Sequence, residues 1–260
     1  MAFSLFWLPE VLRAAGLKVA EQPGWLTRGR GEMGTVRGII CHHTVGGRTG
    51  NMPSLSVLTN GRRLDNGRVL PGPLSQLGLG RDGTYYVIAA GRANHAGAGA
   101  WKGVSGNSHF IGIEAENSGG VNDRWPDEQM DAYCRGVAAI LQKLGLDLGM
   151  CCGHKEYAPQ RKPHDPRFDM DAFRERVRGI MDGTGRTRPL IPSIAPSGRP
   201  TLRRGSRGED VRVVQRKLGI GDDGVFGVLT EAALRRFQRD NGLVADGIAG
   251  PRTWALVDAS

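Results

Sequence analysis

The stretch TVRGIICHHTVGG, residues 35–47, is a short apolar run that ends in two histidines and a glycine-rich turn. The run predicts a strand, and the end of a strand is a rigid place to mount a metal ligand. Because neighbouring residues of a strand point to opposite faces, only one of His42 and His43 can face a given site. We therefore expect this strand to carry one metal-ligating histidine.

The flanking sequence mixes strand and helix patterns without strict alternation. In the second strand pattern, residues 107–117, Gly112, Glu114 and Glu116 share one face. The other expected elements are a helix over residues 53–64, a hairpin over 72–91 with its turn at 81–83, and a helix over 126–145. The predicted fold class is α/β, with a mixed central β-sheet flanked by helices.

The chain is expected to divide within residues 183–200, where proline, glycine and serine recur without a periodic apolar face. Residues 1–182 would then form one domain and residues 201–260 a second. The second domain contains an internal sequence repeat, because DGVFGVLT (223–230) and DGIAGPRT (246–253) each lead into a helical pattern. We predict a small all-α domain of three helices with a core of Val214, Leu218, Leu234, Phe237, Trp254 and Leu256.

The net charge of +9 indicates an acidic partner such as bacterial cell wall, anionic lipid or nucleic acid. Zinc-finger spacing and aromatic RNA-binding motifs are missing from the sequence, so nucleic acid is not expected. No apolar run reaches about eighteen residues, so no stable membrane insertion is expected. We also expect the protein to be a monomer. Residues 1–18 resemble an amphipathic helix more than a signal peptide, which favours synthesis in the cytoplasm of a host cell.

The four cysteines do not make a disulfide framework in a chain of this length. We interpret Cys41, Cys134, Cys151 and Cys152 as reduced and mostly buried thiols. A cysteine peptidase that uses Cys41 or Cys151 is the alternative.

A polar segment, GHKEYAPQRKPHDPRFDM (153–170), holds two histidines, two lysines and several acids. Together with IICHHT (39–44), NHAGAG (94–99) and IGIEAEN (111–117), it resembles the zinc-dependent N-acetylmuramoyl-L-alanine amidases, which include peptidoglycan-recognition proteins. The likeness runs from about residue 37 to residue 170. Residues 202–257 resemble the peptidoglycan-binding domain type 1, and this pairing is typical of phage endolysins.

The resemblance implies roles for particular residues. His42 and His154 match the first two ligands of a Zn²⁺ ion, and Lys162 matches the lysine that stabilises charge on the scissile carbonyl. Glu114 matches the general base of some members, whereas Ser75 stands where other members place a tyrosine. The resemblance places two further residues in the substrate-binding cleft, His95 and Asn107.

The third zinc ligand stays open at this point, because KPHDP has one residue more than the family pattern. Counting from Lys162 selects His164, whereas anchoring on the Asp-Pro pair selects Asp165. Both residues are competent zinc ligands, and the family-like continuation DPRFDM favours Asp165.

The activity that the resemblance implies is hydrolysis of the amide bond between N-acetylmuramic acid and L-alanine in bacterial peptidoglycan, which causes cell lysis. A host autolysin with the same chemistry is one alternative. A non-catalytic peptidoglycan-recognition protein is another.

Overall fold

The computed structural model describes residues 3–64, 66–184 and 198–259 of the chain. These residues form two compact units, Met1–Arg188 and Pro189–Ser260, which are described separately below. The predicted linker, residues 183–200, lies for most of its length outside the described residues. The domain limits of 182 and 201 therefore stay predictions.

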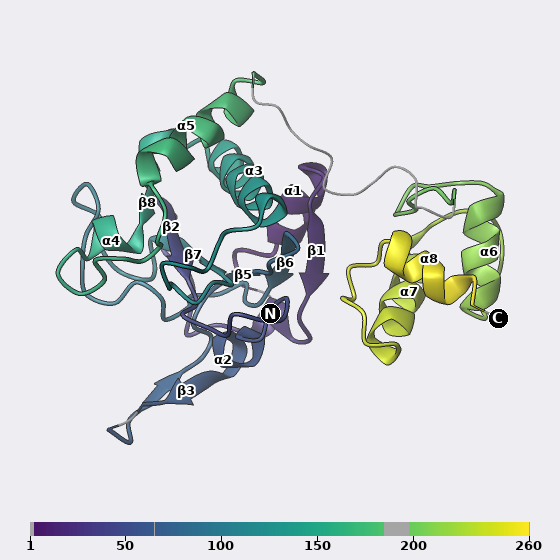
Figure 1. Ribbon diagram of the computed structural model, residues 1–260, viewed down its shortest axis with the longest axis horizontal. Coiled ribbons are helices and arrows are strands. Elements are labelled where there is room, and N and C mark those ends of the chain that lie inside the picture. The colour runs from purple at the N-terminus through teal and green to yellow at the C-terminus, as the bar shows by residue number, and fades with distance from the viewer. Residues whose placement is uncertain (1–2, 65, 185–197, 260) are drawn as a thin grey trace. The chain divides into compact units, whose positions relative to one another are not determined.

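The first unit is built on a six-stranded sheet with the order β1-β6-β5-β7-β2-β8 (Figure 1). Neighbouring strands are parallel except β5 and β6, which form the predicted hairpin. The mixed sheet expected from the sequence is thus confirmed. Its strands are β1 Lys18–Glu21, β2 Gly38–His43, β5 Leu77–Leu79, β6 Thr84–Val87, β7 Phe110–Ala115 and β8 Cys151–Gly153.

Helices flank this sheet, as predicted. The long helix α3 packs against α5 and α1, and the apolar N-terminal segment becomes α1, in which Leu8 and Leu12 are fully buried. None of the described helices is both long and apolar enough to cross a membrane. The helices are α1 Leu8–Ala14, α2 Leu55–Asn60, α3 Asp127–Leu144, α4 His154–Tyr157 and α5 Met170–Met181, with 3-10 turns at Trp25–Thr27 and Leu148–Met150.

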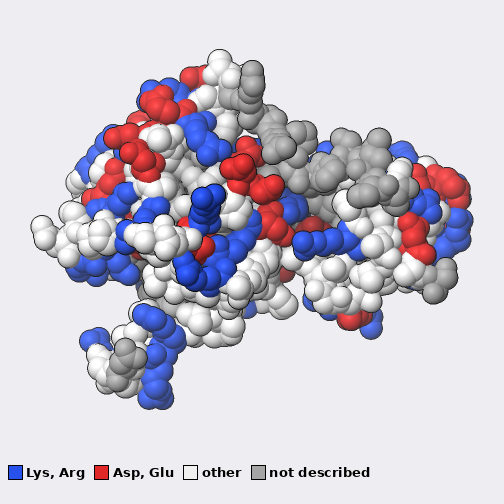
Figure 2. All heavy atoms as spheres, in the orientation of Figure 1, with Lys and Arg blue, Asp and Glu red and all other residues white. Residues whose placement is uncertain are grey.

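The helix expected over residues 53–64 is wrong at its C-terminal end. Helix α2 stops at Asn60 because Gly61 takes a positive φ of 86°, a conformation that favours glycine and ends helices. Gly61–Arg63 (β3) then pairs antiparallel with Val69–Pro71 (β4) as a separate two-stranded arm. Basic side chains gather on this arm (Figure 2), which carries the exposed residues Arg62, Arg63 and Arg68.

The register of β2 against β7 determines which side chains meet at the carboxyl ends of the strands. His42 pairs with Glu114, and Ile40 pairs with Gly112. The hydroxyl of Tyr133, which α3 supplies, accepts a hydrogen bond from the backbone N–H of His42 at 2.9 Å and lies 2.9 Å from the carbonyl of Ile113. A buried side chain therefore fixes the end of β2, where the first candidate ligand lies.

The second unit contains the three predicted helices, α6 Glu209–Lys217, α7 Val228–Asp240 and α8 Pro251–Val257. Its buried core includes Val214, Leu234 and Trp254 from the prediction, with Leu218 and Phe237 partly buried against it. Leu256 was predicted in the core, but Val257 takes that place, because α8 turns Val257 inward and leaves Leu256 half-buried.

The sequence repeat of the second unit corresponds to a structural repeat. The side chain of Gln215 donates to Asp223, Val225 and Thr230 and accepts from the N–H of Gly224. Gln238, 23 positions later, makes the same four bonds to residues that are also 23 positions later, namely Asp246, Gly247, Ile248 and Thr253. Each Asp-Gly loop is therefore held by one buried glutamine of the preceding helix.

Candidate metal centre

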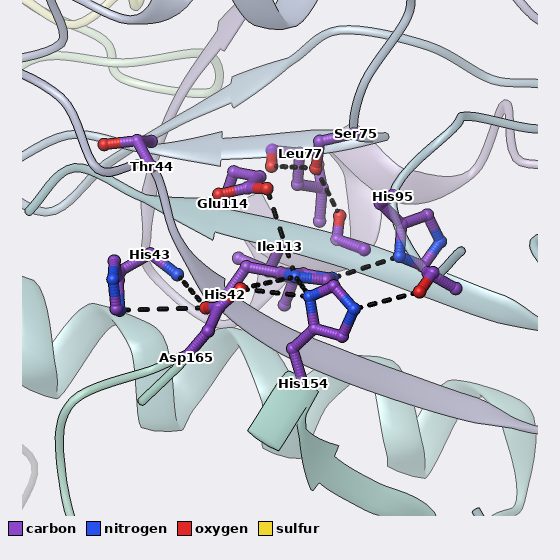
Figure 3. A network of polar contacts seen from close by, with 12 residues as sticks. His42, His43, Thr44, Ser75, Leu77, His95, Ile113, Glu114, His154 and Asp165 are labelled. Carbon is purple, nitrogen blue, oxygen red and sulfur yellow. Dashed lines mark hydrogen bonds and ion pairs between the residues drawn. The ribbon is translucent and has the colours of Figure 1, made fainter. Parts of the chain in front are cut away.

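Three side chains that lie far apart in the sequence converge at the carboxyl end of β2 (Figure 3). Nδ1 of His154 lies 3.0 Å from Nδ1 of His42 and 3.0 Å from Oδ2 of Asp165. The remaining distance, from His42 Nδ1 to Asp165 Oδ2, is 3.6 Å. All three residues are buried, and they form a group that could hold a metal ion.

The spacing of these donor atoms suits a small tetrahedral cation. Ligand atoms about 2.0–2.1 Å from a zinc ion in tetrahedral geometry lie about 3.3 Å from one another, close to the distances observed here. Two imidazole nitrogens and one carboxylate oxygen leave a fourth position open, as in catalytic zinc sites. The donor set therefore fits zinc.

The fold places each of the three residues by a different means. His42 lies at the end of β2, and His154 is the first residue of α4, directly after β8. The backbone N–H of His43 donates to Oδ1 of Asp165 at 2.8 Å, so the strand that presents His42 also holds the carboxylate. The ring of His43 points to the other side, where Nδ1 accepts from the N–H of Arg167. The two adjacent histidines thus face opposite ways, as the strand geometry predicts.

The protonation states suit metal ligands. Burial lowers the pKa of His42 to about 4, and the nearby carboxylate of Asp165 opposes this shift only in part. Burial by itself would raise the pKa of Asp165, but the adjacent imidazole groups of His154 and His42 outweigh it and hold that pKa well below its usual range. Near neutral pH the site therefore presents a neutral His42 imidazole and a charged Asp165 carboxylate, the forms that bind metals.

Glu114 lies next to the three candidate ligands, with Oε1 4.0 Å from Nδ1 of His42. Its side chain is 15 % exposed, and its buried Oε2 has no hydrogen-bond partner among the described residues. Burial raises the pKa of Glu114 well above its usual range, as does the charge of Asp165, while the charge of Lys162 lowers it. A carboxyl group of this kind is able to exchange protons with a bound substrate.

The structure separates the two candidates for the third ligand. Asp165 is 7 % exposed and belongs to the cluster, whereas His164 is exposed and lies outside it. Lys162 is also exposed, but its charge lowers the pKa of both His42 and Glu114, which places it within electrostatic reach of the site. The geometry thus favours Asp165, and the roles of these residues stay predictions.

His95, which was predicted to line the substrate-binding cleft, is a buried residue, and its role in binding stays a prediction. The residue is 8 % exposed, and the two nitrogens of its ring lie 3.1 Å from Nε2 of His42 and 3.0 Å from the carbonyl of Phe110. Both nitrogens are therefore taken up by protein groups. Asn107 likewise turns its side-chain oxygen inward, where it accepts from the backbone N–H groups of His95 and Ala96 at 3.0 and 2.8 Å.

No motif in the sequence indicates these inner contacts directly, although Gly112 is consistent with them. A Cβ atom at position 112 would lie 2.6 Å from Cγ of His95, so only glycine leaves room for the ring beside β7. Ser75, the counterpart of the family tyrosine, is fully buried and donates to the carbonyls of Leu77 and Gly112. Its hydroxyl proton therefore already has partners within the protein.

The cysteines are free and buried, as predicted. Sγ of Cys41 lies 3.7 Å from Sγ of Cys151, and neither residue is exposed. Burial raises the pKa of Cys41 well above its usual range, so the thiol stays protonated. These observations argue against a cysteine peptidase.

Several known proteins are similar to parts of this chain. The zinc D-Ala-D-Ala carboxypeptidase of Streptomyces albus G is 47% identical over 62 residues, which are 21% of this chain and 24% of that protein. An uncharacterized protein from Kitasatospora aureofaciens is 41% identical over 66 residues, 23% of this chain and 56% of that protein. The chain thus spans about a quarter and just over half of these curated relatives.

Two solved structures also match parts of this chain. The Burkholderia AP3 phage endolysin is 47% identical where it matches, over 23% of this chain and 25% of that one, with a TM-score of 0.22. The endolysin N-acetylmuramoyl-L-alanine amidase LysCS from Clostridium intestinale URNW is 21% identical over 62% of this chain and 95% of that one, with a TM-score of 0.43.

Two protein families match the sequence itself. Residues 207–257 match a family of peptidoglycan binding domains, and this region contains all of α6, α7 and α8. Residues 32–167 match the family described as N-acetylmuramoyl-L-alanine amidase, and they include every candidate ligand described above. Since this match covers more than half of the 260 residues, the chain belongs to the N-acetylmuramoyl-L-alanine amidase family.

Proposed function

We propose that this chain is a zinc-dependent N-acetylmuramoyl-L-alanine amidase that cuts the amide bond between N-acetylmuramic acid and L-alanine in bacterial peptidoglycan. The observation that carries the proposal is the buried cluster of His42, His154 and Asp165 with Glu114 beside it. A bound zinc ion supplies Lewis acidity, which polarises a carbonyl group and makes water easier to deprotonate.

Two residues near the cluster act in the proposed reaction. Glu114 takes a proton from the attacking water while the water oxygen bonds to the amide carbon. Glu114 then returns that proton to the leaving nitrogen as the C–N bond breaks. Lys162 stabilises the negative charge that develops on the carbonyl oxygen. The products are the carboxylate of the lactoyl group and a peptide with a free L-alanine amino group.

The second unit is proposed to hold the enzyme on its polymeric substrate. Its match to peptidoglycan binding domains supports this role, and the net charge of +9 suits an acidic cell wall. We further propose a phage-type lytic protein that acts as a monomer, neither inserts into membranes nor binds nucleic acid, and reaches the wall after the membrane has been permeabilised. Such a protein lyses cells only when it is expressed together with a membrane-permeabilising partner. A host autolysin would not need that partner.

Mass spectrometry of the fragments released from purified peptidoglycan tests the reaction. The expected products are free stem peptides that begin with L-alanine, lost on chelation and restored by zinc. A non-catalytic recognition protein would bind peptidoglycan but release nothing. Cleavage within the peptide or the glycan that persists in chelator would contradict the proposal.

A further inference from the structure

In both histidines of the candidate metal centre, Nδ1 points toward the site and Nε2 points toward the segment that contains His95 and Ala96. Nε2 of His154 lies 2.9 Å from the carbonyl oxygen of Ala96. Nε2 of His42 lies 3.1 Å from Nδ1 of His95, the residue before Ala96. Two adjacent residues therefore contact the outer nitrogens of the two rings, and Figure 3 shows the contact of His42 with His95.

These contacts determine which ring nitrogens carry protons. A carbonyl oxygen can only accept, so Nε2 of His154 donates to Ala96 and leaves the lone pair of Nδ1 for a metal. The carbonyl of Phe110, 3.0 Å from Nε2 of His95, likewise requires a proton on that nitrogen. Nδ1 of a neutral His95 is then an acceptor, so Nε2 of His42 donates to it and the Nδ1 lone pair of His42 also faces the site.

One side chain holds the segment that makes these contacts. Oδ1 of Asn107 accepts from the backbone N–H groups of both His95 and Ala96, at 3.0 and 2.8 Å. Arg161 supports the same segment from outside by donating to the carbonyls of Ala96 and Ala98. The backbone N–H groups of both His95 and Ala96 are therefore held by a single amide oxygen, while Arg161 holds the carbonyl side of the segment.

We infer that Asn107 and His95 are positioning residues of the metal centre, which present the Nδ1 lone pairs of His42 and His154 to the ion. The inference rests on the proposed function, because it requires that the cluster binds zinc. Groups that orient metal-bound histidines in this way commonly change metal affinity by about 10–100-fold when they are removed. Neither residue contacts the ion or the substrate in this role.

An isosteric pair at position 107 tests the inference in the full chain. Asn107→Asp keeps an oxygen that can accept both backbone N–H groups, whereas Asn107→Leu has the same shape and no acceptor. We expect Asn107→Leu to raise the zinc dissociation constant, measured by competition with a chelator, by about 10–100-fold. Asn107→Asp is expected to stay within about threefold of the wild type, because its carboxylate restores both hydrogen bonds.

A second pair of variants, at position 95, tests the same inference in case a variant at position 107 fails to fold. His95→Asn keeps an acceptor near the place of Nδ1, whereas His95→Leu removes it, so only His95→Leu should weaken zinc binding strongly. The visible spectrum of the cobalt-substituted protein should change in intensity and position with His95→Leu and Asn107→Leu, because the ligand geometry is altered. Far-UV circular dichroism checks that each variant folds.

The outcomes separate the inference from the function on which it rests. Wild-type zinc affinity and an unchanged cobalt spectrum in both leucine variants would overturn the positioning role while leaving the amidase intact. A wild-type protein that binds no zinc, or whose zinc binding survives Asp165→Ala, would overturn the metal centre and the inference together.

Discussion

The backbone N–H of His43 donates to Oδ1 of Asp165 at 2.8 Å, while the other carboxylate oxygen of Asp165 lies 3.0 Å from Nδ1 of His154. One oxygen of this side chain thus binds the backbone of β2, and the other lies among the donor atoms of the candidate metal centre. This division explains why Asp165, and not its neighbour in the sequence, has the geometry of a ligand.

Asp165→Ala and His164→Ala form a matched pair that tests the third ligand. We expect Asp165→Ala to lose bound zinc and the amidase activity, because two nitrogens alone do not hold the ion. His164→Ala should keep both, because His164 is exposed and lies outside the cluster. Metal content after dialysis, measured by elemental analysis, checks this. The reverse pattern would make His164 the ligand.

Glu114→Gln should lower the hydrolysis rate by about 10²–10⁴-fold, because a neutral amide cannot take the proton of the attacking water. Zinc content should be unchanged, because Glu114 is not one of the three candidate ligands. A loss of zinc together with activity would instead show that Glu114 belongs to the metal site.

The pH dependence of hydrolysis should also report Glu114. A general base works as the carboxylate, so the rate rises as pH passes upward through its pKa, which burial raises above the usual range. Hydrolysis rates of the wild type and Glu114→Gln are measured across pH with a soluble muropeptide, and the rise of the rate with pH should differ between them. The same rise in Glu114→Gln would show that another group causes it.

The ion pair of Arg81 with Asp123 should give a distinct pH dependence of stability. The two guanidinium nitrogens lie 3.1 and 2.9 Å from the two carboxylate oxygens, and hydrogen bonds from Arg81 lower the pKa of Asp123 to about 2. Since the folded pKa lies below the ordinary value of 3.8, this stabilisation is full above that value and is lost as pH falls through it toward 2.

Arg81→Met should therefore lower the free energy of unfolding near pH 7 by about 1–2 kcal/mol, with a difference from the wild type that shrinks below pH 4. Urea unfolding at several pH values measures this. Arg178→Met is the control, because Arg178 and its partner Glu175 are both more than half exposed and such pairs contribute little. Equal losses in the two variants would contradict the special role of the Arg81 pair.

Gln238→Met tests the loop-holding glutamines of the second unit. The methionine removes hydrogen bonds from a side chain that is 1 % exposed and leaves buried loop groups without partners. We expect a loss of about 1–3 kcal/mol and faster hydrogen exchange in residues 246–253. Arg239→Met, at the next and exposed position of α7, should leave exchange there unchanged. Unchanged exchange in Gln238→Met would show that the loop holds its own shape.

The sheet was predicted from local patterns, whereas the candidate ligands were predicted from the resemblance to the amidase family. The apolar run before His42 and the alternation of Glu114 with apolar neighbours each specify a strand. The family motifs placed His154 and either Asp165 or His164 in the same site as His42. The inward position of His95 was missed because it depends on a loop that packs beside Gly112, across a long stretch of sequence. Periodicity carries no information about such packing.

The β3–β4 arm was missed for a different reason. Residues 55–60 have a helical pattern that the next few residues could continue, but the chain reverses at Gly61, where the backbone adopts a conformation open to glycine. An Asn-Gly pair at this place and a second one at residues 66–67 were the available turn signals. The prediction extended the helix along a short apolar pattern, whereas the Asn-Gly pairs determine where the chain turns.

The two glutamine-held loops of the second unit are interleaved along the chain. Helix α7 begins within the first loop, through Thr230, and supplies Gln238, which holds the second. Removing α7 would take Thr230 from the first loop and Gln238 from the second. The two loops therefore depend on one shared helix, so that a change in the position of α7 acts on both.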